Sequence, residues 1–152
     1  MTTAGAAAEQ IELPFVIDAS AVMAFIYDEP GGDSIQAVLS RSIITCVNFG
    51  EVLVKVSTRF KIDPATVESL LEASGLGVAV LDQATCRRFP SLSDIDRKSR
   101  MSRSSTNVRP LSLADLSCLA FATEHDLPVL TADRHWAELR NFGLRPDVFL
   151  IR

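Results

Sequence analysis

The 152-residue chain contains 47% hydrophobic and 22% charged residues, a composition typical of a soluble globular protein with one core. No apolar run approaches the roughly 20 residues that span a bilayer, and the N-terminal segment lacks the basic start and apolar stretch of a signal peptide. We therefore expect a flexible tail over residues 1–12, a single domain over 13–152 and a cytoplasmic location. The formal net charge of −4, taken alone, argues against nucleic-acid binding.

Short apolar strands and helices alternate along the chain. The first strand is expected over residues 15–17, and the helix after it is expected to end at Pro30 and two glycines. Further strands are expected over residues 43–47, 77–82, 128–133 and 148–151. Further helices are expected over residues 33–42, 48–61, 63–75, 111–126 and 134–143, and in the first part of 84–108. Because no hairpin turn such as Asn-Gly joins the strands, the pattern predicts an α/β sandwich with a mainly parallel central sheet surrounded by helices.

Four acidic residues fall at or near the ends of predicted elements. Asp18 ends the first strand, Asp133 follows the fourth, and Glu51 lies one turn into the helix after the second strand. Asp115 lies in the first turn of the helix over 111–126 and shares a face with apolar residues. Sites in such folds lie at the carboxyl ends of the strands, where converging carboxylates would repel each other without a cation. The pattern indicates a site for Mg²⁺ or Mn²⁺, which suits in-line attack on a phosphodiester.

Helix capping is an alternative explanation for each acid taken singly. Ser112 and Asp115 have the spacing of a capping box, as do Asn48 and Glu51, and the other two acids are possible N-caps. Helix N-termini favour negative charge, so capping needs no ligand. Only the joint placement of the four acids argues for a shared site.

A basic segment lies between residues 87 and 109. Seven basic residues stand against two acidic ones there, so the segment carries +5 and the rest of the chain −9. The basic residues are Arg87, Arg88, Arg97, Lys98, Arg100, Arg103 and Arg109. The segment is either a flexible, solvated surface or a phosphate-binding region, and the sequence leaves both open.

Other chemistries find little support in the sequence. His125 and His135 have no partners at zinc-ligand spacing, and we expect both at the surface. Cys46, Cys86 and Cys118 match no zinc pattern either, and we expect them to be reduced and mostly buried. The chain contains no Walker-type loop, no G-x-G-x-x-G loop and no G-x-S-x-G elbow.

Four segments, taken together in their order and spacing, resemble the motifs of PIN-domain ribonucleases, in particular the VapC toxins of bacterial toxin–antitoxin pairs. The segments are FVIDASAVMAFIYDEPG, NFGEVLVK, LSLADLSCLAFA and LPVLTADRHWAEL, and the similarity extends from about residue 14 to the C-terminus. The resemblance implies a PIN-like α/β/α sandwich. It also implies that Ser20 and Thr131 support a metal site, although both are equally well explained as caps. The catalytic, metal-binding quartet of the family corresponds to Asp18, Glu51, Asp115 and Asp133.

The resemblance further implies what the protein does. Members of the family hydrolyse RNA phosphodiester bonds with a water that Mg²⁺ or Mn²⁺ activates, and the basic segment would contact the RNA backbone. A small antitoxin is expected to cover the cleft, and the toxin is expected to form a homodimer. The chain departs from the family pattern at Leu116, where many relatives carry arginine, and over 91–108, which is more polar than usual.

Two other functions stay open at this point. One is a catalytically weak PIN-like module that binds RNA or protein, against which the intact quartet argues. The other is a phosphatase with an aspartyl nucleophile. That chemistry commonly needs a second acid two residues after the first, and Ser20 occupies this position after Asp18.

Overall fold

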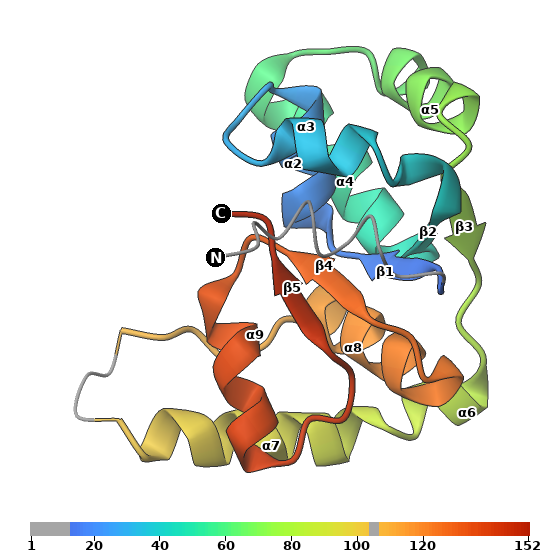
Figure 1. The fold of residues 1–152 in the computed structure, drawn as a ribbon. Helices are drawn as coiled ribbons and strands as arrows, with labels where there is room; N and C mark the ends of the chain where they lie inside the picture. Colours follow the sequence, from blue (N-terminus) through green and yellow to red (C-terminus); the bar gives the residue numbers. More distant parts are fainter. Residues whose placement is uncertain (1–12, 104–106) are drawn as a thin grey trace.

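A five-stranded, all-parallel sheet forms the centre of the protein, in the order β3-β2-β1-β4-β5 (Figure 1). The structure, a computed structural model, describes residues 13–103 and 107–152, so the tail expected over 1–12 lies outside the described residues. The strands are β1 (Phe15–Ile17), β2 (Ser42–Thr45), β3 (Gly77–Ala79), β4 (Val129–Thr131) and β5 (Val148–Leu150). The predicted α/β sandwich with a parallel sheet is confirmed.

Helices cover both faces of this sheet (Figure 1). On one face lie α2 (Ala19–Ile26), α3 (Gly32–Gln36), α4 (Cys46–Phe60) and α5 (Pro64–Ala73). On the other face lie α7 (Phe89–Met101), α8 (Leu113–His125) and α9 (Arg134–Leu139), with α6 (Gln83–Cys86) packed against α8. Two short 3₁₀ helices span Leu39–Arg41 and Arg140–Phe142. Within the described residues, no helix has both the length and the apolar character needed to cross a bilayer.

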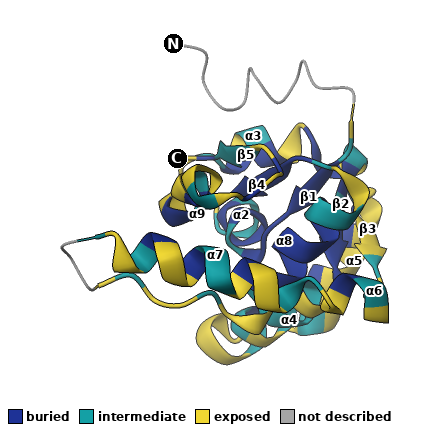
Figure 2. Ribbon diagram, turned by 90° about the horizontal axis from the view of Figure 1, so that it is seen from below, coloured by how far each residue is buried: buried dark blue, intermediate teal, exposed yellow. Residues whose placement is uncertain are grey.

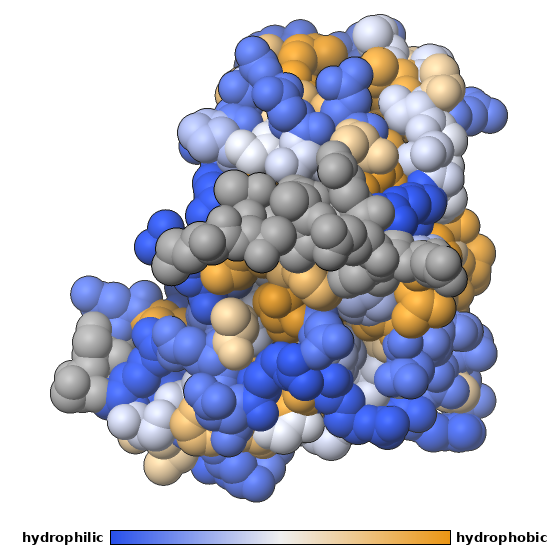
Figure 3. Space-filling view, in the orientation of Figure 1, coloured by the Kyte–Doolittle hydropathy of each residue, from blue (hydrophilic) through white to orange (hydrophobic). Residues whose placement is uncertain are grey.

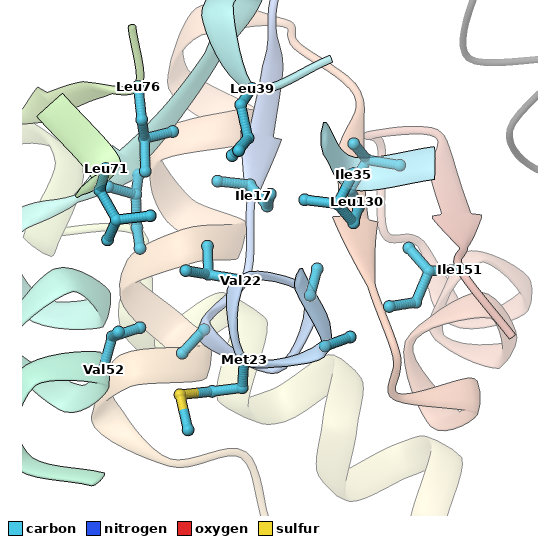
Figure 4. Packing of buried hydrophobic residues seen from close by; sticks show 14 of the residues in the cluster. Ile17, Val22, Met23, Ile35, Leu39, Val52, Leu71, Leu76, Leu130 and Ile151 are labelled. Atoms are coloured by element: carbon cyan, nitrogen blue, oxygen red, sulfur yellow. The ribbon is translucent and has the colours of Figure 1, made fainter. Parts of the chain in front are cut away.

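The central strand β1 contributes to a hydrophobic core on each face of the sheet. Phe15 and Ile17 belong to the core under α2, α4 and α5, and Val16 belongs to the core under α8 and α9. Figure 4 shows Ile17 and Val22 within the first of these cores. Figure 2 shows that β1 and β4 are buried along their length. The core therefore fixes the position of the residue that follows β1.

The boundary between β2 and α4 differs from the predicted one. The sequence predicted a strand to residue 47, but β2 ends at Thr45 and α4 begins with the next residue. Thr45 is the N-cap of α4, because its Oγ1 accepts a hydrogen bond from the backbone N–H of Asn48 at 3.2 Å. The predicted capping box of Asn48 and Glu51 is therefore wrong, and both residues are free for other contacts.

Some of the cysteines and one of the histidines lie where the sequence did not predict them. All three cysteines are free, but only Cys118 is buried, while Cys46 is half-buried and Cys86 is exposed. His125 is exposed, as expected. His135 is buried, which the sequence did not predict.

Candidate active site

Asp18 lies directly after β1 and is 4% exposed. Its Oδ2 accepts hydrogen bonds from Ser20 Oγ at 2.6 Å and from Thr131 Oγ1 at 3.0 Å. Its Oδ1 accepts a longer bond from Asn48 Nδ2 at 3.3 Å. Three side chains from three elements thus fix the orientation of one buried carboxyl group.

Ser20 and Thr131 also bind backbone groups, but neither is an N-cap, because Asp18 and Asp133 hold the N-cap positions of α2 and α9. Ser20 Oγ accepts a hydrogen bond from the N–H of Ala132 at 3.0 Å. Thr131 Oγ1 accepts one from the N–H of Asp133 at 3.0 Å. Each hydroxyl therefore joins the Asp18 carboxyl to the backbone at the end of β4.

The environment of Asp18 disfavours its charged form. Burial raises the pKa of the Asp18 carboxyl from 3.8 to about 6. The negative charges of Asp115 and Glu51 contribute to this rise, while the hydrogen bonds from Ser20 and Thr131 oppose it. The charge interactions show that Asp18 lies near two of the other three predicted acids.

Asp115 forms the predicted capping box with Ser112 at the start of α8. Ser112 Oγ accepts a hydrogen bond from the N–H of Asp115 at 3.1 Å, and Asp115 Oδ2 accepts one from the N–H of Ser112 at 2.8 Å. Burial nevertheless raises the pKa of the Asp115 carboxyl, and the charges of Glu51 and Asp133 add to the rise. Asp115 therefore caps its helix and lies close to other acids at the same time.

Ser112→Ala is expected to lower the free energy of unfolding by about 1 kcal/mol, because the hydroxyl that caps α8 is lost. Urea unfolding measures the change. Ser69→Ala on α5 is a matched control, since Ser69 is exposed and forms no side-chain hydrogen bond within the described residues. The control is expected to change stability by no more than about 0.5 kcal/mol. Equal losses in the two variants would contradict the capping role.

Three of the four predicted acids line one cavity of about 630 Å³. Glu51 reaches it from α4, where it also forms an ion pair with Lys55 at 2.8 Å. Asp115 reaches it from α8, and Asp133 reaches it from the N-terminus of α9, which it caps. Asp18 adjoins this group through its charge interactions with Asp115 and Glu51. The structure thus brings the four predicted acids to one end of the sheet, while their catalytic role stays a prediction.

The acids carry the ligand atoms that a divalent cation prefers, but they are not arranged as a metal site. Carboxylate and hydroxyl oxygens are the ligands that Mg²⁺ and Mn²⁺ prefer. A cation among the acids would also relieve the repulsion that contributes to the raised pKa of Asp18 and of Asp115. Among the residues that the structure describes, however, no three Asp, Glu, His or Cys side chains form a group that could hold a metal. The donor set fits the ion, and the side chains would have to close around it.

The basic segment is largely helical over the residues that the structure describes. Its part over 89–101 is α7, which presents a mainly hydrophilic surface (Figures 1 and 3). Five of the seven predicted RNA-binding residues form ion pairs with acids. The pairs are Arg88 with Glu124, Arg97 and Lys98 with Asp94, Arg100 with Asp96, and Arg103 with Glu138. Arg87 and Arg109 are exposed, and Arg109 lines the cavity.

A buried carboxylate–histidine pair beside the cavity was missed in the sequence. Asp96 is 1% exposed and lies 2.9 Å from His135, between Oδ1 and Nε2. Its Oδ2 accepts hydrogen bonds from Arg100 Nε at 2.9 Å and from the N–H of Leu111 at 3.2 Å. Asp96 therefore joins α7 to the start of α9 and to the segment that leads into α8. The prediction of a surface position for His135 is wrong because this partner, 39 residues away, holds the ring inside.

Arg134 was not predicted either, because it lies outside the basic segment. It follows Asp133 directly and lines the same cavity. Its position beside a predicted site acid was the available signal.

Comparison with known proteins relates this chain to one family. Residues 15–141 match the model of the PIN domain. No match was found among curated protein sequences. A toxin–antitoxin complex from Klebsiella pneumoniae matches with a TM-score of 0.62 and 17% identity over 91% of this chain and 98% of that chain. A DNA-bound VapBC from Salmonella typhimurium matches with a TM-score of 0.60 and 17% identity over 90% and 98%. At this identity the two structures show likeness of fold alone.

Proposed function

Because the chain belongs to the PIN-domain family, we propose that it is a metal-dependent endoribonuclease and the toxin of a type II toxin–antitoxin system. PIN domains are typically nucleases. The observation that carries the proposal for this chain is the cavity lined by Glu51, Asp115 and Asp133, with Asp18 beside it. Four acids from four separate parts of the chain meet there, although capping alone would require no such meeting.

The chain's own side chains have distinct parts in the proposed reaction. Asp18, Glu51, Asp115 and Asp133 would hold Mg²⁺ or Mn²⁺. When bound, the metal would lower the pKa of the attacking water and offset charge on the scissile phosphate. Ser20 and Thr131 keep the Asp18 carboxyl oriented through their hydrogen bonds. The reaction requires no protein nucleophile.

The proposed partners follow from the relatives. One of the solved structures named above is a toxin–antitoxin complex and the other is a DNA-bound VapBC, which supports a small cognate antitoxin for this chain. A basic side chain of such an antitoxin would offset the charge of the acids that line the cavity. We further expect a homodimer, as the family resemblance implies. Size-exclusion chromatography of the purified chain measures whether it forms this dimer.

Cleavage of single-stranded RNA by the purified chain is expected with Mg²⁺ or Mn²⁺ and not with EDTA. Asp115→Asn is expected to lower the rate at least about 100-fold, since the metal stabilises the transition state by several kcal/mol. Glu72→Gln, at an exposed acid on α5, is the control and should cleave like the wild type. Gel analysis of labelled RNA measures all three.

The outcomes separate the proposal from its alternative. A fully active Asp115→Asn protein, or cleavage that persists in EDTA, would overturn the assignment of the site. Folded wild type that binds RNA but cuts it at no metal concentration would support the weakly catalytic binding module instead.

A further inference from the structure

Two arginines line the cavity beside the acids without a partner of their own. Arg109 and Arg134 both contribute to the wall of the 630 Å³ cavity that contains Asp115 and Asp133. Both are exposed, and neither forms an ion pair or a side-chain hydrogen bond within residues 13–103 and 107–152. They come from different segments, one just before α8 and the other in the first turn of α9.

The cations of the basic segment between Arg88 and Arg103 each form an ion pair with an acid of this chain. Arg103 also lines the cavity, but it is paired with Glu138, which lines the same cavity. The cations of α7 are paired with Asp94 and Asp96. The positive charge of the basic segment is therefore largely balanced where it lies.

A strand of RNA that enters this cavity would be repelled by the acids that line it. Its phosphates are negative, and so are the acids on which the proposed chemistry depends. Unpaired guanidinium groups beside the acids offset this repulsion, because arginine binds phosphate through two parallel hydrogen bonds and keeps its charge at any physiological pH. Arg109 and Arg134 are the two residues of the cavity wall that meet this requirement.

We propose that Arg109 and Arg134 bind backbone phosphates of a single-stranded RNA next to the acidic site, and that the paired cations of α7 do not. This inference rests on the proposed function and assigns its substrate contacts. It changes the expectation from the sequence in two ways. Most of the basic segment is removed from the binding surface, and Arg134, which lies outside that segment, is added to it.

The dependence of RNA binding on salt tests the inference independently of cleavage. Binding of a short fluorescein-labelled single-stranded RNA is followed by anisotropy with Mg²⁺, in an Asp18→Asn background where cleavage is expected to be lost. Each phosphate contact to a single strand contributes about 0.7 to the slope of log affinity against log salt. Arg109→Gln and Arg134→Gln should each reduce the slope by about 0.7 and weaken binding roughly fivefold near 0.1 M salt.

Arg87→Gln is the matched control. Arg87 is exposed and unpaired within the described residues, and its replacement changes the net charge equally, but it does not line the cavity. The control should leave the slope unchanged, and Arg134→Lys should restore it because the positive charge returns. Equal effects of all three glutamine variants, or none, overturn the inference while RNA binding by the parent leaves the proposed function standing. A parent that binds no RNA overturns both.

Discussion

Asp18→Asn is expected to stabilise the metal-free protein while removing its cleavage activity. Burial raises the pKa of this carboxyl from 3.8 to about 6, so between these values the folded state holds a proton that the unfolded state has released. The free energy of unfolding therefore falls as the pH rises through this range. Above about pH 6 the full difference, about 3 kcal/mol, acts against the folded protein. Asparagine has nearly the same shape and no charge, so it avoids this cost.

Urea unfolding in EDTA at several pH values measures the effect. The variant should be more stable than the wild type at pH 7.5, and the difference should shrink towards pH 4. Asp94→Asn is a control of opposite sign, because Lys98 and Arg97 lower the pKa of the exposed Asp94 carboxyl, so that its charged form is favoured. A wild type that is as stable as Asp18→Asn at pH 7.5 would contradict the raised pKa of Asp18.

Asp96→Ala is expected to lower the free energy of unfolding by about 3–5 kcal/mol, the range for breaking a buried charged pair. The change leaves Arg100, His135 and the N–H of Leu111 without their shared acceptor. Because Asp96 joins the segments that carry Asp115 and Asp133, cleavage should fall even at temperatures where the variant is folded.

A substitution two residues away on the same helix isolates this effect. Asp94→Ala removes an exposed acid whose partners, Arg97 and Lys98, are also exposed, and it should cause a much smaller loss of stability. Asp96→Asn, which keeps the size and one acceptor oxygen, should fall between the two. Denaturant midpoints and cleavage rates measured side by side provide both comparisons. Indistinguishable midpoints for Asp96→Ala and Asp94→Ala would contradict the joining role of Asp96.

The parallel direction of the strands and the meeting of Asp18 and Asp133 could be anticipated from the sequence, and both have the same cause. Strands without hairpin turns between them must run parallel, and the carboxyl ends of parallel strands share one edge of the sheet. Asp18 and Asp133 follow β1 and β4, which are neighbours in the sheet. The local capping pattern of Ser112 and Asp115 could also be recognised in the sequence, since it involves residues three apart.

The features that were missed depend on contacts between distant segments. No residue near His135 in the sequence indicates that Asp96 is its hydrogen-bond partner, because Asp96 reaches it from another helix. The end of β2 at Thr45 is an exception, because it depends on a local contact in which Thr45 caps α4 by accepting a hydrogen bond from the N–H of Asn48. The basic segment looked uniform in sequence, yet ion pairs with distant residues such as Glu124 and Glu138 separate its neutralised cations from Arg109.

Because β4 pairs with β1, the proposed site can be completed only late in the synthesis of the chain. Ribosomes release the N-terminal part first, and β1 then has β2 as a partner but lacks β4, which pairs with its other edge. Thr131, which binds Asp18, lies 113 residues further along the chain, and Asp133 follows it. A polypeptide interrupted before β4 thus has neither a complete sheet nor a complete set of acids. For the proposed nuclease, we therefore expect a chain that ends before β4 to be inactive.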